Sequence, residues 1–211
     1  ILVYTTGIKI MTEVNVNREV LDAYSTYSYR LKFPIGDNKV WVKEILQWES
    51  RILEKTSQDK LDAYGVATPP NLLNQPVFDE LKSGISNIVN LILKPLYIDG
   101  VEIVYNDSWA NIFRKGDYAP LHIHEDSHWS CVYYLTATGN SPLYFKDPRA
   151  LPVMDSSVPL LKNKYHTLTQ KKEFSSGELI LFPSWLEHGV MENKTDDVRV
   201  SLASNFRVIM K

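Results

Sequence analysis

The chain has 211 residues, of which 44% are hydrophobic and 23% are charged, and its formal net charge is -2. This composition is typical of a soluble globular protein and excludes disordered and fibrous classes, while the length predicts a single domain that spans residues 1–211. A charge so close to zero offers no positive surface for a phosphate backbone, so nucleic acid is not an expected partner.

The cysteine content and the hydropathy indicate a cytoplasmic protein with no membrane anchor. Cys131 is the only cysteine, so no internal disulfide can form and nothing points to an oxidising compartment. It falls in an apolar run typical of a strand, where we expect a small core residue rather than a nucleophile. No stretch approaches the ~20 apolar residues that cross a bilayer. The sequence gives no signal for the oligomeric state.

The first hundred residues show helical spacing. In residues 40–55 the apolar side chains fall largely on one stripe and the charged ones on the other faces, which predicts a helix packed against other structure. Residues 77–93 repeat this pattern until Lys94 and Pro95 end it. We therefore expect residues 1–100 to be mainly helical and to support a core built by residues 101–211.

After Asp99 and Gly100 the apolar pattern changes to a period of two. Short runs rich in β-branched and aromatic residues lie between turn signals, at residues 101–105, 110–113, 129–135, 143–145, 178–182 and 198–206. Many short strands at this spacing predict a mainly β sandwich or barrel with supporting helices. Residues 148–172 lack such a pattern and are expected to form a long loop, of the kind that often covers a binding site.

Histidines gather at two places within this β region. His122 and His124 are two residues apart, so in one strand their side chains point to the same face, as Asp126 would if the strand continued that far. His188 follows another apolar run and a turn. Imidazole and carboxylate groups arranged in this way are the ligands of non-haem iron sites. The residues leave open whether the three histidines bind the metal or Asp126 replaces His122.

Three segments resemble the Fe(II)/2-oxoglutarate dioxygenase superfamily. Residues 111–124 are similar to its N-x-Y-x-x-G-x5-H-x-D run, and residues 131–135 resemble the third core strand of its prolyl-hydroxylase branch. Residues 176–190, followed by Arg199 to Ser201, resemble the segment with the distal histidine and the arginine that binds 2-oxoglutarate. The resemblance is greatest to the 2OG-Fe(II) oxygenases of bacteria and phages, in which an H-x-H pair occurs with F-P-x-x-L-x-H-G-V, and it covers about residues 104–207.

The resemblance implies a double-stranded β-helix, a jelly-roll fold like that of the cupins, with Fe(II) and 2-oxoglutarate as cofactors. It places metal ligands at His122, His124 and His188, with His124 where most of the family has its carboxylate. It also implies that Arg199 binds the far carboxylate of 2-oxoglutarate, since a guanidinium can form two parallel hydrogen bonds to a carboxylate.

Further residues of the cosubstrate pocket follow from the same resemblance. Ser201 lies two residues after Arg199 on the same strand face and can add a hydroxyl donor, and Tyr134 occupies the position of a tyrosine that reaches 2-oxoglutarate. Phe113 stands where many relatives have another tyrosine, so Asn111 is a candidate for the missing donor. Asp126, if it is not a ligand, can accept a hydrogen bond from a ligand imidazole.

The implied activity is that of a dioxygenase that consumes O2 and 2-oxoglutarate, releases succinate and CO2, and hydroxylates its substrate. The expected substrate is an amino-acid side chain, peptidyl or free, or a small metabolite. Two alternatives are a cupin-like three-histidine dioxygenase that does not use 2-oxoglutarate, and a non-catalytic jelly-roll binding module. Residues outside the metal ligands are not expected to act as catalytic acids or bases.

Overall fold

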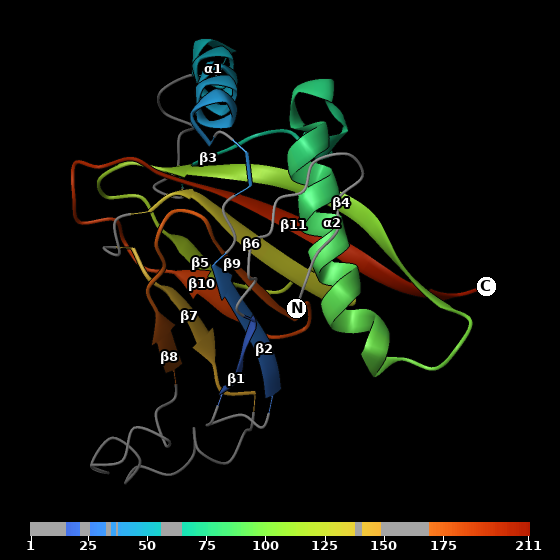
Figure 1. Cartoon of the computed structure of the whole chain (residues 1–211). Coiled ribbons are helices and arrows are strands. Elements are labelled where there is room, and N and C mark those ends of the chain that lie inside the picture. Colours follow the sequence, from blue (N-terminus) through green and yellow to red (C-terminus); the bar gives the residue numbers. More distant parts are fainter. Residues whose placement is uncertain are drawn as a thin grey trace, which may run out of the picture.

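The computed structural model describes residues 16–21, 26–32, 35–36, 38–55, 65–137, 141–148 and 169–211. Two antiparallel sheets face one another, and helices cover the outer face of the larger one (Figure 1). This is the double-stranded β-helix that the sequence predicts. Within the described residues, no helix is both long enough and apolar enough to span a bilayer.

Among the described residues, the larger sheet has seven strands and the smaller has four. In spatial order the larger sheet contains β1 (Val16–Leu21), β2 (Thr26–Lys32), β9 (Glu178–Pro183), β6 (Trp129–Thr136), β11 (Arg199–Met210), β4 (Val101–Phe113) and β3 (Val66–Ala67). The smaller sheet contains β5 (Ala119–His122), β10 (His188–Val190), β7 (Leu143–Lys146) and β8 (Thr169–Lys172). Consecutive strands pair near the edges of the sheets, whereas the central pairs join non-consecutive strands, so segments far apart in the sequence meet at the centre of both sheets.

The period of two in the long strands separates two hydrophobic cores. Alternate residues of β11, such as Val200 and Leu202, face the helices and belong to the larger core. The residues between them, such as Arg199 and Ser201, face the space between the two sheets. Cys131 is completely buried in the helix-side core, as expected, and burial raises the pKa of its thiol to about 12.

In the part of the chain that the structure describes, two α-helices and three short 3₁₀ turns form the layer over the larger sheet. The helices are α1 (Asn38–Lys55) and α2 (Asp79–Leu93), and the turns are η2 (Leu72–Asn74), η3 (Pro76–Phe78) and η4 (Lys94–Leu96). In α2 the buried side chains recur every three or four residues, which places them on the face toward the sheet. Both helices confirm the predicted helical segments to within two residues at each end.

Strands in the first hundred residues were not expected. Residues 16–32 contain β1 and β2, which extend the larger sheet through pairing of β2 with β9. Tyr29 and Leu31 are buried and alternate with more polar residues. This period of two is typical of a strand, and the prediction that residues 1–100 are mainly helical did not take it into account. The division into helical support and β core is therefore wrong for this segment, while the single domain stays a prediction.

Three further details of the predicted strands and loops differ in the structure. The two expected strands at 101–105 and 110–113 are one strand, β4, with an irregularity in its pairing to β11 between Asn205 and Phe206. β5 ends at His122, so His124 lies in the loop that follows. Of the predicted loop at 148–172, residues 169–172 form β8, and residues 149–168 lie outside the described part of the chain.

Candidate functional site

Three histidines from two strands and a loop converge between the sheets. His122 in β5 lies directly opposite His188 in β10, and His124 follows β5. One nitrogen from each ring forms a group whose members all lie within 4.8 Å of one another. The ring centroids of His122 and His188 are 4.4 Å apart, and those of His124 and His188 are 4.9 Å apart. The structure thus brings together the three predicted imidazoles.

Each of these rings uses its Nδ1 atom for a hydrogen bond to the protein. His122 Nδ1 lies 2.8 Å from the carbonyl oxygen of Pro120, and His188 Nδ1 lies 2.7 Å from that of Leu186. His124 Nδ1 lies 2.7 Å from the side-chain oxygen Oδ1 of Asn205. Because a carbonyl oxygen can only accept, the proton of each neutral ring belongs on Nδ1, and the lone pair is on Nε2. Such partners fix the tautomer that a metal-binding histidine needs.

His124 is held by a buried network of polar side chains. The Ser130 hydroxyl donates to Asn205 Oδ1 at 2.8 Å and lies 2.9 Å from His124 Nδ1. Ser130 and Ser184 share a hydrogen bond of 2.7 Å between their hydroxyls. The backbone N–H of His124 also donates to the carbonyl oxygen of Ser184 at 3.0 Å. The loop histidine is therefore fixed at both its backbone and its ring.

The environment of His124 and His188 favours the neutral form of both rings. Burial and, to a smaller extent, the neighbouring His122 and His124 lower the pKa of His188 to about 3. Burial likewise lowers the pKa of His124, although the hydrogen bond to Asn205 opposes this effect. His122 is the most exposed of the three. Neutral imidazoles are the form that binds a metal ion.

The geometry of the facing nitrogens fits a divalent cation. Nε2 of His122 and Nε2 of His124 lie only 3.4 Å apart. With the protons on Nδ1, these two lone pairs point at each other, which is unfavourable unless a cation or a proton lies between them. A set of imidazole ligands suits iron, zinc, copper and nickel. The residues present thus fit a transition-metal ion bound through three Nε2 atoms.

Asp126, the alternative ligand, does not join this cluster. Its side chain is exposed in a turn with a positive φ of 57°. Its carbonyl oxygen accepts a hydrogen bond of 2.7 Å from Nε of Arg207, which fixes the backbone of the turn on the outside of the molecule. Since the chain leaves β5 after His122, the alternation of side chains that would aim Asp126 at the metal stops there.

A buried arginine lies in the same cavity as the histidines. Arg199 is only 4% exposed, and its guanidinium carbon lies 5.2 Å from the centre of the Phe113 ring and 5.0 Å from that of Tyr134. Its Nε and Nη1 atoms have no hydrogen-bond partner among the described residues, and neither does the Tyr134 hydroxyl. Burial lowers the pKa of Arg199, and the nearby Tyr134 opposes this shift.

Such a guanidinium is costly to bury unless an anion accepts its hydrogen bonds. The cavity that holds it also contains the side chains of Asn111 and Ser201, and the three histidines line the same space. Its lining residues are Trp109, Asn111, Phe113, Ala119, His122, His124, Val132, Leu143, His188, Val190, Arg199, Ser201 and Ala203. The arrangement therefore fits a molecule that presents an acidic group to Arg199 and further donor atoms to a metal ion.

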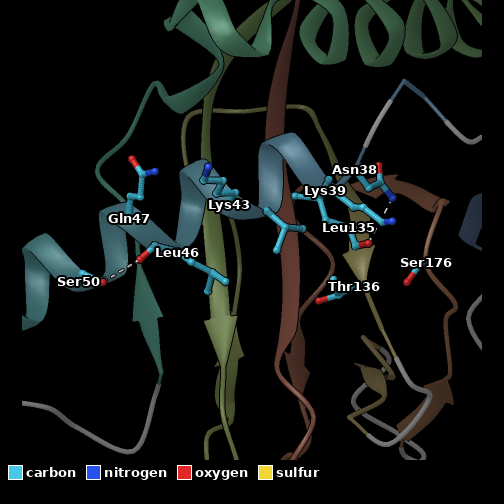
Figure 2. A pocket seen from close by; sticks show the side chains of 10 residues that line it. Asn38, Lys39, Lys43, Leu46, Gln47, Ser50, Leu135, Thr136 and Ser176 are labelled. Carbon is cyan, nitrogen blue, oxygen red and sulfur yellow. Dashed lines mark hydrogen bonds between the residues drawn. The ribbon is translucent and has the colours of Figure 1, made fainter.

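A second hollow lies on the other side of the larger sheet, between α1 and the end of β6 (Figure 2). It is open to solvent and lined by residues such as Lys39, Lys43 and Thr136. Among the described residues its lining contains no histidine, cysteine or carboxylate, so it lacks the usual ligands of a metal ion. The chemistry is concentrated in the cavity between the sheets.

Sequence reasoning missed the residues that support His124. Asn205, Ser130 and Ser184 come from β11, β6 and the turn after β9, and they meet only in the folded sheet. One signal was present: Asn205 follows Arg199 and Ser201 at even spacing along one strand, so all three point to the same face. That spacing identifies Asn205 as a candidate once the face of β11 is known.

Comparison with known proteins points to one family. Residues 107–205 match the family model described as "Putative 2OG-Fe(II) oxygenase". This segment, slightly less than half of the chain, includes the three histidines and Arg199. No curated protein matches the chain.

Solved structures share the fold at low sequence identity. The non-heme alpha-ketoglutarate-dependent carbocyclase SnoK from nogalamycin biosynthesis aligns with a TM-score of 0.59 and 12% identity, covering 91% of this chain and 84% of SnoK. HygX from Streptomyces hygroscopicus, solved with nickel and 2-oxoglutarate bound, aligns with a TM-score of 0.56 and 13% identity, covering 86% and 83% of the two chains. AviO1 from Streptomyces viridochromogenes has a TM-score of 0.53 at 13% identity, with coverage of 83% and 87%.

Proposed function

We propose that this chain, whose residues 107–205 belong to the 2OG-Fe(II) oxygenase family, hydroxylates an amino-acid side chain, peptidyl or free, or a small metabolite. The reaction consumes O2 and 2-oxoglutarate, the cosubstrate of this family, and releases succinate and CO2. The observation that carries the proposal is a single cavity in which three metal-competent imidazoles lie with a buried guanidinium, two of whose nitrogens have no partner among the described residues.

The metal ligands in this proposal are the Nε2 atoms of His122, His124 and His188. These three residues would hold the iron ion, and the bound ion would be able to take up 2-oxoglutarate and O2. The hydrogen bonds at Nδ1 support this role because they orient each ring before the metal binds. Asp126 is not included, since its side chain is exposed on a turn.

Arg199 is proposed to bind the far carboxylate of 2-oxoglutarate. A bidentate guanidinium–carboxylate pair would provide acceptors for the buried nitrogens that lack them. Two further observations support this role: Ser201 lines the same cavity, and Tyr134, its pairing partner on the adjacent strand, has its ring beside the guanidinium. Asn111 lies opposite Ser201 on β4 and can donate from its amide. The Phe113 ring packs against the guanidinium but cannot form a hydrogen bond to 2-oxoglutarate, so Ser201, Tyr134 and Asn111 would provide these bonds.

The protein's own contribution to the reaction is binding, orientation and exclusion of water. Iron and 2-oxoglutarate, when bound, supply the activation of O2 and the oxidation of a C–H bond, which protein side chains cannot perform. Phe145 and Phe182 pack against His188, and Trp109 packs against His124 at 5.1 Å between ring centroids. These aromatic walls keep the ligand rings in place and limit the access of water.

Anaerobic titration tests the proposal directly. Adding Fe(II) and then 2-oxoglutarate to the metal-free protein is expected to produce a weak visible absorption from metal-to-ligand charge transfer. Fe(II) alone and 2-oxoglutarate alone should not produce it. On admission of O2, succinate should accumulate even without a substrate, at a low rate. If the protein binds Fe(II) but no absorption develops with 2-oxoglutarate, the proposed cosubstrate is wrong.

The ligand set itself favours one second candidate, a three-histidine dioxygenase that acts on a substrate bound directly to iron. Such an enzyme would share the histidines but would have no use for the buried Arg199, whose Nε and Nη1 have no partner in the described part of the chain. The ratio of succinate formed to O2 consumed separates the two. A ratio near one supports the 2-oxoglutarate reaction, whereas O2 uptake without succinate supports the second candidate.

A further inference from the structure

The proposed site has an unusual charge, and this charge motivates a further inference that rests on the proposed function. An iron site with two histidines and one carboxylate carries one negative charge among its protein ligands, whereas three neutral histidines carry none. Iron(II) and the 2-oxoglutarate dianion cancel each other, which leaves the positive charge of Arg199. A buried site with an unbalanced charge is disfavoured, so another group nearby has to supply a negative charge.

Asp107 lies where such a charge is needed. It is in β4, directly opposite Asn205 in β11, and residues opposite each other in a ladder point to the same face of the sheet. Asn205 is the residue whose Oδ1 lies 2.7 Å from His124 Nδ1. Trp109, the next residue of β4 on that face, contacts the ring of His124. Asp107 is therefore beside the residues that surround His124.

The carboxylate of Asp107 is itself incompletely hydrogen-bonded. Its Oδ1 atom is buried and has no hydrogen-bond partner among the described residues. A buried carboxylate oxygen without a donor costs free energy, and such a group in a native fold calls for a functional explanation. A cation bound at the histidines would compensate for this cost through the electric field alone, without direct contact.

We infer that Asp107 is a positioning residue that supplies, from outside the ligand shell, the negative charge that a carboxylate ligand would otherwise provide. It stabilises the divalent ion at His122, His124 and His188 and balances the charge of Arg199 when 2-oxoglutarate is bound.

This role predicts effects of opposite sign on two ligands. Replacing Asp107 with asparagine keeps the shape and removes the charge. The affinity for Ni(II), a redox-inert probe for the divalent site, should then fall by about tenfold, as for other outer partners of metal ligands. The affinity of the Ni(II)-loaded protein for 2-oxoglutarate should rise severalfold, because the site that receives the dianion is more positive. Isothermal titration calorimetry measures both.

Asp126→Asn is the matched control. It removes a carboxylate from the loop just after His124, at an exposed position with a positive φ that asparagine tolerates. Both affinities should stay within twofold of those of the unmodified protein. A loss of Ni(II) binding in this variant would make Asp126 a ligand and would overturn both the three-histidine site and the charge argument.

The remaining outcomes separate failure of the inference from failure of the function. If Asp107→Asn weakens the binding of both ligands, Asp107 has a merely structural role and the inference is wrong. The same holds if neither affinity changes by more than twofold. If the unmodified protein binds Ni(II) but the loaded protein does not bind 2-oxoglutarate, the proposed function itself fails, whatever the variants do.

Discussion

Replacing Arg199 with methionine should have opposite effects on stability and on cosubstrate binding. Methionine has a similar length and can keep the contacts with the rings of Phe113 and Tyr134, but it has no charge and no donors. The structure gives two reasons to expect a large effect. The guanidinium is almost completely buried, and two of its nitrogens lack partners among the described residues.

The stability of the ligand-free protein should increase. An unsatisfied buried donor costs about 1–3 kcal/mol, so the two nitrogens cost about 2–6 kcal/mol together. The two cation–π contacts return roughly 0.5–2 kcal/mol each, which leaves a net cost of about 2 kcal/mol for keeping the arginine. For a chain of this size, about 2 kcal/mol corresponds to a rise in melting temperature of about 4–8 °C. Differential scanning calorimetry of the metal-free protein measures this shift.

Binding of 2-oxoglutarate should fall sharply in the same variant. Removing one partner of a buried, hydrogen-bonded charge pair costs about 2–5 kcal/mol, which is roughly a thirtyfold to several thousandfold increase in Kd. The affinity for Ni(II) alone should change little, since the histidines remain. Arg207→Met is the control, because Arg207 lies on the same strand but is exposed. A variant that keeps its 2-oxoglutarate affinity, or that melts at a lower temperature, would refute the role given to Arg199.

Three further predictions concern the rest of the site and the core. Asn205→Ala should weaken Ni(II) binding by about 10- to 100-fold, because His124 loses the acceptor that fixes its tautomer. Calorimetry measures this affinity. The control Asn90→Ala, in α2, should leave the affinity unchanged. The pKa of His188 is lowered to about 3, so between pH ~6.5 and 3 the unfolded chain binds more protons than the folded protein does. The metal-free protein should therefore lose stability as pH falls through this range. In urea titrations, His188→Gln should reduce the dependence of stability on pH. Cys131 should react with a thiol reagent only in denaturant, since its thiol is buried with a pKa of about 12; rapid labelling of the native protein would contradict its burial.

The grouping of the histidines could be predicted because it depends on local spacing and on turns. His188 follows a strand and a turn in the sequence, and its position at the head of β10 agrees with that pattern. The convergence of His122 and His124 was predicted from the alternation of side chains along one strand, but a different cause brings them together. The chain leaves β5 after His122, and His124 reaches the cluster through its backbone bond to Ser184 and its ring bond to Asn205. Those contacts depend on tertiary structure, which spacing does not encode.

The strands β1 and β2 show a second limit of sequence reasoning. Their pairing with β9 places residues 26–32 beside a segment about 150 positions later, and the advantage of that pairing comes from the partner strand. Asp107 shows a third limit. On sequence alone it is one of many carboxylates, and only its register opposite Asn205 places it near His124.

Strand β11 connects the two halves of the proposed site. Arg199 and Ser201 line the cavity, and Asn205 on the same strand face holds the ring of His124, so one strand carries both the anchor for an anion and the support for His124. Its neighbours β4 and β6 are in register with it along this face, from Phe113 opposite Arg199 to Ser130 opposite Asn205. A slip of one residue in this register would turn the whole set toward the helices. Because the other face of β11 is fixed by apolar residues packed in the helix-side core, that core also determines the position of the anion anchor relative to the metal ligands.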